Sequence, residues 1–160
     1  MRLTQATVRA ERDRVRENDR VVPLVNDVRD ALGDAFEADV GHVTREQYAR
    51  EVDAVFADGD VAVNVAALAG LLRDLDVAGD YPGFVVDELL GRELAATLAG
   101  GRPFSLLAEA TFHYADIHTH GSDGEAAGRD DLDAALAAGF QTRLPGWDWT
   151  ETESPFAIEE

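Results

Sequence analysis

Apolar residues recur at helical spacing along most of the chain and predict a series of amphipathic helices. Val61, Val63 and Val65 alternate with other residues and would also suit a short extended segment, but the longer stripe around them favours a helix. A further short helix is predicted for residues 130–138, and Gly139 is expected to end it. The five stripes are Val25, Val28, Leu32 and Phe36; Tyr48, Val52, Val55 and Phe56; Val65, Leu68, Leu72 and Leu75; Val86, Leu90, Leu94 and Leu98; and Phe104, Leu107, Tyr114 and Ile117.

Residues at the expected helix ends support these assignments. Thr44 and Gln47 have the spacing of a capping box, in which each side chain binds the other residue's backbone amide. Pro23 suits a first helical turn, and Gly100 suits a left-handed helix end. We therefore predict an all-α fold, a small single-domain bundle of about six helices.

The two ends of the chain do not share this pattern. Residues 1–20 are rich in Arg and Glu with few large apolar residues, and we expect a projecting, helical N-terminal arm. Residues 140–160 contain Pro145, Gly146 and Pro155 and have no helical period, which predicts an extended C-terminal arm. The predicted organisation is an arm (1–20), a helical bundle (21–139) and a second arm (140–160).

The charge of the chain indicates an unusual solvent. The chain has 32 acidic and 14 basic residues, a net charge of −18, and every one of its basic residues is Arg. At about 1 M salt the screening length falls to about 3 Å, so the self-repulsion of such a surface largely disappears. We expect a halophilic protein from an archaeon or its virus.

The charge is distributed unevenly. Residues 1–20 carry six Arg against four acidic residues, whereas the remainder is strongly acidic. Arg9, Arg12, Arg16 and Arg20 would form one stripe on a helix, which could bind an acidic neighbouring subunit or could pair with carboxylates of its own chain. A nucleic-acid partner is disfavoured, because the acidic body would repel phosphates.

The C-terminal arm carries large side chains that could anchor a partner. In an extended conformation Trp147 and Trp149 face one way, as do Phe156 and Ile158. Such anchors supply much of the binding energy of protein interfaces. The alternative is that the arm folds back and covers the protein's own core.

One segment suggests metal chemistry. His118 and His120 form a His-x-His pair, and Asp131 follows His120 after ten intervening residues. Two imidazoles and one carboxylate make a catalytic zinc set with an open fourth position. The spacing resembles that of JAMM metalloproteases, which implies a zinc hydrolase. In a helix the two His side chains would point to different sides, whereas in a strand they would share a face.

The chain has no Cys, which excludes disulfides and thiolate sites. Its N-terminus lacks the apolar run of a secretory signal, and no segment is apolar enough to cross a bilayer. These features predict a cytoplasmic protein, or a virion protein if a virus encodes it.

These observations together favour a non-enzymatic interaction or assembly protein without a cofactor, whose arms bind a protein partner or neighbouring subunits. In layout it resembles the head-to-tail adaptors of tailed viruses, a helical body with an extended C-terminal arm, which implies a structural virion component. The alternative function is a zinc-dependent hydrolase that uses His118, His120 and Asp131.

Overall fold

The computed structural model describes residues 1–75, 86–100, 108, 111, 112, 115 and 127–146. These residues form helices and connecting segments, with no strand among them, which confirms a small all-α bundle. The helices are α1 (Gln5–Glu17), α2 (Val21–Phe36), α3 (Arg45–Ala57), α4 (Gly59–Asp74), α5 (Val86–Ala99) and α7 (Ala127–Gln141).

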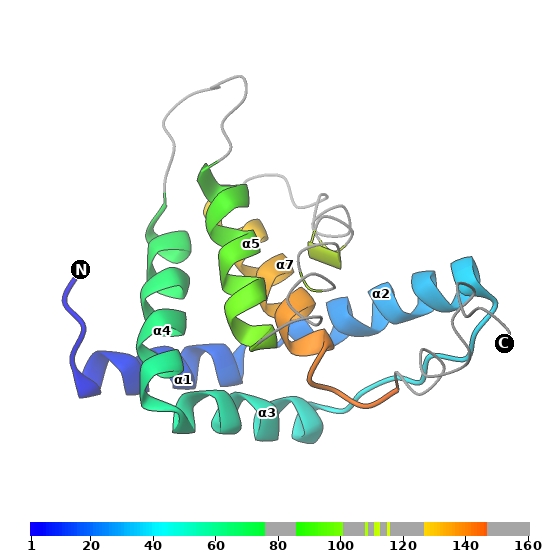
Figure 1. Cartoon of the computed structure of the whole chain (residues 1–160), viewed down its shortest axis with the longest axis horizontal. Coiled ribbons are helices and arrows are strands. Elements are labelled where there is room, and N and C mark those ends of the chain that lie inside the picture. Colours follow the sequence, from blue (N-terminus) through cyan, green and yellow to red (C-terminus); the bar gives the residue numbers. More distant parts are fainter. Residues whose placement is uncertain (76–85, 101–107, 109–110, 113–114, 116–126, 147–160) are drawn as a thin grey trace, which may run out of the picture.

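Helix α7 is the centre of the bundle. It contacts α2, α3, α4 and α5, and every residue from Asp131 to Gln141 is buried. Figure 1 shows α4 and α5 side by side with α7 behind them, while α1 and α3 cross below. Seven of the fifteen residues of α7 are Ala or Gly, and these small residues allow several helices to approach it closely.

Two glycines set the packing around α5 and α7. A Cβ at Gly139 would lie 2.6 Å from the Cβ of Leu98 on α5, and one at Gly91 would lie 2.5 Å from the ring of Phe112. The sequence suggested that Gly139 ends the helix. In the structure Gly139 lies inside α7 and provides space for Leu98. Phe140 and Gln141 are part of α7, so the bundle extends beyond residue 139.

The predicted capping signals are confirmed. The Thr44 amide donates to the Gln47 side chain at 2.9 Å, and the Gln47 amide donates to the Thr44 hydroxyl at 3.2 Å. Gly100 follows α5 with a φ of 78°, a left-handed conformation that glycine adopts without strain.

Helices α3 and α4 are separated by a single residue. Asp58 ends α3, and its side chain accepts hydrogen bonds from the Asp60 and Val61 amides at the start of α4, each at 3.2 Å. None of the described helices alone is long and apolar enough to span a membrane. The α3–α4 pair meets that criterion only when taken together, and it is bent by 111°.

Most of the predicted apolar stripes face the core where the structure describes them. Val25, Val28, Val52, Val65 and Leu94 are all buried. Two predicted positions are exceptions, since the Phe36 side chain is 61% exposed at the end of α2 and Val86 is exposed at the start of α5. Both lie in terminal turns that extend past the neighbouring helices. The stripe expected in residues 104–117 falls mostly outside the described residues.

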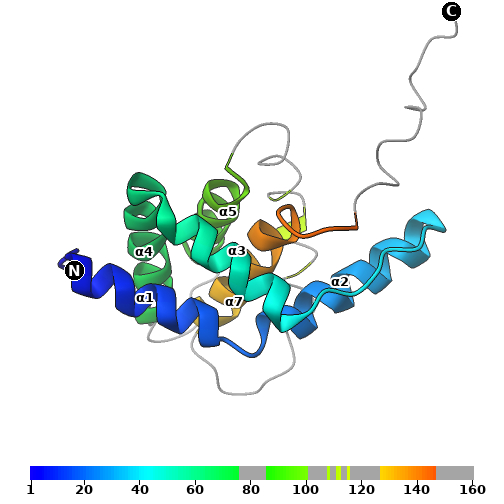
Figure 2. The ribbon, with the colours of Figure 1, turned by 90° about the horizontal axis from the view of Figure 1, so that it is seen from below.

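Residues 1–20 are helical, as predicted, but they lie along the bundle rather than standing away from it. Helix α1 contacts α3 and α4, which the view in Figure 2 also shows. Val15 is buried, and the Tyr48 hydroxyl donates to the Val15 carbonyl at 2.6 Å. One apolar residue and one buried hydrogen bond thus help to hold a helix whose sequence is almost entirely polar.

Candidate functional site

Most of the residues predicted to bind a partner or zinc lie outside the described part of the chain. The four stripe arginines and Asp131 lie within the described ranges, and Asp131 is buried near the start of the fully buried part of α7. Among the described residues, no group of three or more His, Asp or Glu side chains is placed to hold a metal ion. The predicted residues outside the described ranges are His118, His120, Trp147, Trp149, Phe156 and Ile158.

The four stripe arginines lie in different surroundings. Arg16 pairs with Asp53 on α3 at 3.3 Å, and Arg12 pairs with its neighbour Asp13 at 2.8 Å. These exposed pairs within one chain match the second of the two interpretations offered above, and they contribute little to stability. The third paired arginine, Arg20, lines a polar pocket, and Arg9 lines an apolar groove.

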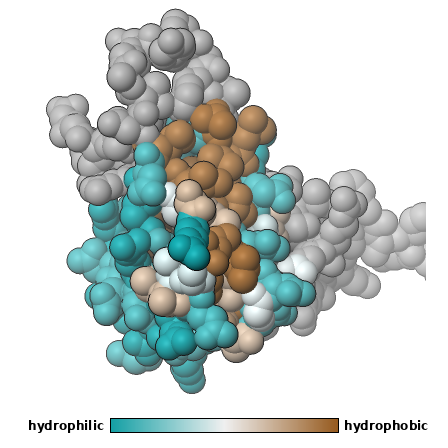
Figure 3. Space-filling model, turned by 90° about the vertical axis from the view of Figure 1, so that its left-hand side faces the viewer, coloured by the Kyte–Doolittle hydropathy of each residue, from teal (hydrophilic) through white to brown (hydrophobic). Residues whose placement is uncertain are grey.

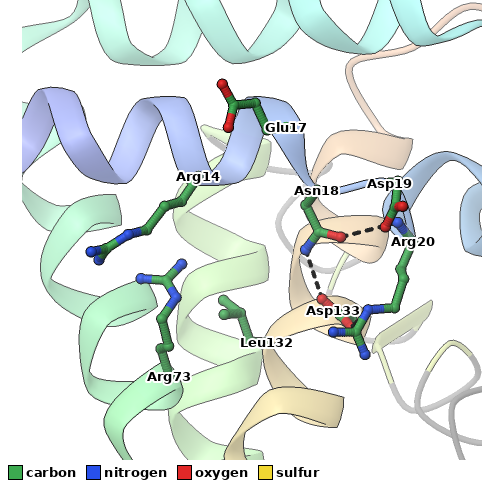
Figure 4. Close-up of a pocket in the computed structure, with 8 residues that line it drawn as sticks. All are labelled: Arg14, Glu17, Asn18, Asp19, Arg20, Arg73, Leu132 and Asp133. Carbon is green, nitrogen blue, oxygen red and sulfur yellow. Dashed lines mark hydrogen bonds and ion pairs between the residues drawn. The ribbon is translucent and has the colours of Figure 1, made fainter.

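The polar pocket lies where α1 turns into α2, above the buried face of α7 (Figure 4). Asp133 of α7 accepts a hydrogen bond from the Asn18 side chain at 2.8 Å and pairs with Arg20 at 3.4 Å. The pocket has a volume of about 340 Å³. It is lined by Arg14, Glu17, Asn18, Asp19, Arg20, Arg73, Leu132 and Asp133.

A second carboxylate, that of Glu11, lies beside this pocket and joins α1 to α4. Arg14 pairs with Glu11 at 2.8 Å, and Arg73 of α4 also donates to both of its carboxylate oxygens. In Figure 4 the guanidinium groups of Arg14 and Arg73 extend toward each other from their two helices. Glu11 and Asp133 are thus each bound by donors of the same chain, which explains how α1 is held on the bundle.

The polar pocket is lined mainly by charged and amide side chains. Its lining residues include no Ser, Thr, Cys, Lys or His, and its acidic groups are Glu17, Asp19 and Asp133. The nearby Tyr48 hydroxyl is buried, and this burial, reinforced by the negative charge of Asp133, raises its pKa well above the ordinary value. Tyr48 therefore remains a neutral hydrogen-bond donor.

A buried arginine fixes the point from which the C-terminal segment continues. Arg29 of α2 donates to the Gln141 side chain at 2.6 Å and to the Gly41 carbonyl at 2.7 Å. Gln141 in turn donates to the Val25 carbonyl at 3.1 Å. Burial lowers the pKa of Arg29 to about 10, which leaves the group charged at neutral pH. A Cβ at Gly146 would lie 2.7 Å from the Arg29 guanidinium, so the chain passes directly over it.

An apolar groove opens between the start of α1 and the start of α4. Figure 3 shows the face of the molecule on this side, where hydrophobic side chains form a band surrounded by hydrophilic ones. The groove has a volume of about 360 Å³, at the lower end of the range of about 300 to 1,000 Å³ for ligand pockets. It is lined by Leu3, Thr4, Gln5, Val8, Arg9, Phe56, Gly59, Ala62 and Val63.

Sequence reasoning missed this groove, although one signal was present. Val61, Val63 and Val65 alternate at the start of α4, and the alternation suggested a short strand as a second possibility. In the structure the segment is helical, and Val65 is buried while Val63 is 41% exposed on another side. The alternation therefore reflects a helix that is apolar on more than one face.

The chain belongs to the family described as "Domain of unknown function (DUF7984)", which matches residues 1–160. No curated protein and no solved structure matches the chain.

Proposed function

We propose that this chain is a non-enzymatic assembly protein, a helical body that binds neighbouring subunits through its terminal segments. The observation that carries the proposal is the apolar groove beside α1 and α4. A groove lined by Leu3, Val8, Phe56 and Val63 is costly to expose on a soluble surface, and such patches typically mark binding sites.

The distribution of charge supports the same function. The N-terminal segment beside the groove is the one stretch of the sequence with a marked excess of Arg, while the C-terminal segment from Trp147 onward has five acidic residues and no basic one. Opposite charges on two ends of one chain favour contacts between copies. The net charge of −18 supports a working environment of high salt, in a halophilic archaeon or in a virus that infects one.

A structural virion component is the specific form of this proposal that fits the layout best. A helical body with an aromatic C-terminal segment is what an adaptor needs in order to join neighbouring subunits. The fold contributes a fixed exit for that segment, because the Arg29 contacts hold the chain as far as Gly146. The chain can then reach about 3.3 to 3.6 Å further for each extended residue.

The proposal is tested by removing the C-terminal segment. The deletion should begin at Trp147, because Leu144 belongs to the core and its loss would damage the bundle. We expect the full chain to form oligomers in molar KCl, and the shortened chain to be monomeric with unchanged helicity. Light scattering coupled to gel filtration measures the mass, and circular dichroism measures the helicity. Equal masses for two well-folded chains would contradict assembly through this segment.

A further inference from the structure

We propose that the groove between α1 and α4 of one copy binds the last five residues, Phe156 to Glu160, of the next copy. This inference rests on the proposed function and assigns the two surfaces that would meet. It predicts a head-to-tail contact, in which each copy supplies a groove at one side and a C-terminal segment at the other.

The groove offers an apolar floor with a cation beside it. Phe56 at the end of α3 and Ala62 on α4 lie deeper, whereas Leu3 and Val63 are exposed at its sides. Arg9 of α1 lines the same groove and is exposed. A matching ligand would therefore present one or two large apolar side chains followed by a carboxylate.

The C-terminal residues of the chain have this composition. Phe156 and Ile158 lie two positions apart, so in an extended strand both side chains point to the same side. Glu159 and Glu160 follow directly and would lie near Arg9 when the apolar pair is bound. In molar salt the apolar contact supplies most of the affinity, and the charged pair mainly sets the direction of binding.

The positions of the two surfaces favour a second copy as the source of the ligand. Figures 1 and 2 both place the start of α1 at one end of the molecule and the end of the described C-terminal stretch on the opposite side of the bundle. Arg29 of α2 binds the Gln141 side chain and lies close to Gly146, so that stretch begins beside α2, away from the groove. Repeated contacts between two different surfaces produce a closed ring or an open filament.

The decisive experiment mixes two full-length variants that are defective on opposite surfaces. Val63→Glu places a charge in the groove and leaves the C-terminal residues intact. The double variant Phe156→Glu, Ile158→Glu has an intact groove and a defective C-terminal segment. Leu89→Glu on α5 is the control, because Leu89 is an exposed apolar residue outside the groove.

We expect wild type and the Leu89→Glu control to assemble in molar KCl, and each of the other two variants to be monomeric, with self-association weakened by about tenfold or more. An equimolar mixture of those two variants should form a one-to-one heterodimer, since one supplies the groove and the other the C-terminal segment. Analytical ultracentrifugation measures the masses, and circular dichroism confirms that each variant is folded.

Three outcomes would overturn the inference. If Val63→Glu assembles like wild type while the C-terminal variant is monomeric, the segment binds elsewhere, and the proposed function survives without this groove. If the mixture of the two monomeric variants gives no heterodimer, the two surfaces do not bind each other. If wild type itself is monomeric in molar KCl, a second copy is not the occupant, and the proposed self-assembly fails as well.

Discussion

A glycine lies against an apolar side chain at two places in the molecule, one in the contact between α5 and α7 and one on the outer face of α4. The exposure of the apolar side chain differs between the two places. In the first, Leu98 of α5 packs on Gly139 of α7, and Leu98 is 0% exposed. In the second, the Met1 side chain covers Gly70 of α4, which is buried, while Met1 itself remains 70% exposed. A glycine thus accommodates an apolar side chain in both places. The contact is closed where two helices meet and open where a chain end lies on the surface.

The difference shows which part of this small protein is closely packed and which part is available to a partner. The central helix is enclosed by its neighbours, and its residues from Asp131 to Gln141 are buried. The outer face of α4 has large apolar residues, such as Val63 and Leu71, that its own chain leaves exposed. Substitutions on the two sides should accordingly differ in their effect on stability.

The largest effect is expected from Gln141→Leu in the closed region. This change removes one acceptor of the buried Arg29 side chain and a side-chain donor to the Val25 carbonyl. Loss of both contacts should lower the free energy of unfolding by about 3 kcal/mol, because a charged donor and a carbonyl lose partners in the interior. Urea denaturation followed by circular dichroism measures the free energy of unfolding. A value equal to that of wild type would show that the buried Arg29 side chain does not need Gln141 as a partner.

Gly139→Ala should have the next largest effect. The added methyl group would lie 2.6 Å from the Leu98 Cβ and 3.1 Å from the Ala95 carbonyl oxygen, so the two helices would have to separate. Overpacking of this kind costs about 1 to 3 kcal/mol, which exceeds the helix propensity gained. Thermal denaturation should show a lower midpoint. A higher midpoint would mean that the contact between α5 and α7 is looser than described.

Tyr48→Phe should cost about 1 kcal/mol through loss of the hydrogen bond to Val15. It should also change the response to alkali. The folded protein raises the pKa of the Tyr48 hydroxyl, so the stability gained from the neutral group is complete below the ordinary value of 10.0 and is lost as the pH rises above it. Between about pH 8 and about pH 10.5, urea denaturation should therefore show a larger decrease in the free energy of unfolding for wild type than for the variant. Equal decreases for the two proteins would contradict the raised pKa of Tyr48.

The smallest effect, opposite in sign, is expected from Gly70→Ala on the open face. The nearest atom to the added methyl group is the Met1 Cε, at the far end of a flexible and exposed side chain that can move away. The gain in helix propensity should then stabilise the protein by about 0.5 to 1 kcal/mol. A loss of stability as large as that of Gly139→Ala would show that Met1 is fixed in place and that the two regions are packed alike.

Much of the secondary structure followed from short-range signals. The Thr44 and Gln47 cap, the left-handed Gly100 and most of the apolar stripes of α2, α3 and α4 were correctly predicted. Such features depend on residues within one or two turns, whose interactions the sequence displays directly. The candidate site was predicted less well, since Arg9 is the one residue among the described members of the predicted partner-binding set that lines the groove.

What the sequence by itself determined is the all-α class, the position of most helices, and the uneven charge of the chain. The tertiary structure alone decided that α7, with its small and partly polar residues, occupies the centre, and that α1 lies on the bundle. It also decided that Gly139 belongs inside a helix and that Val63 faces outward. The physical reason is that a small residue or a second apolar face can be either buried or exposed. Which of the two it becomes depends on which distant helix packs against it.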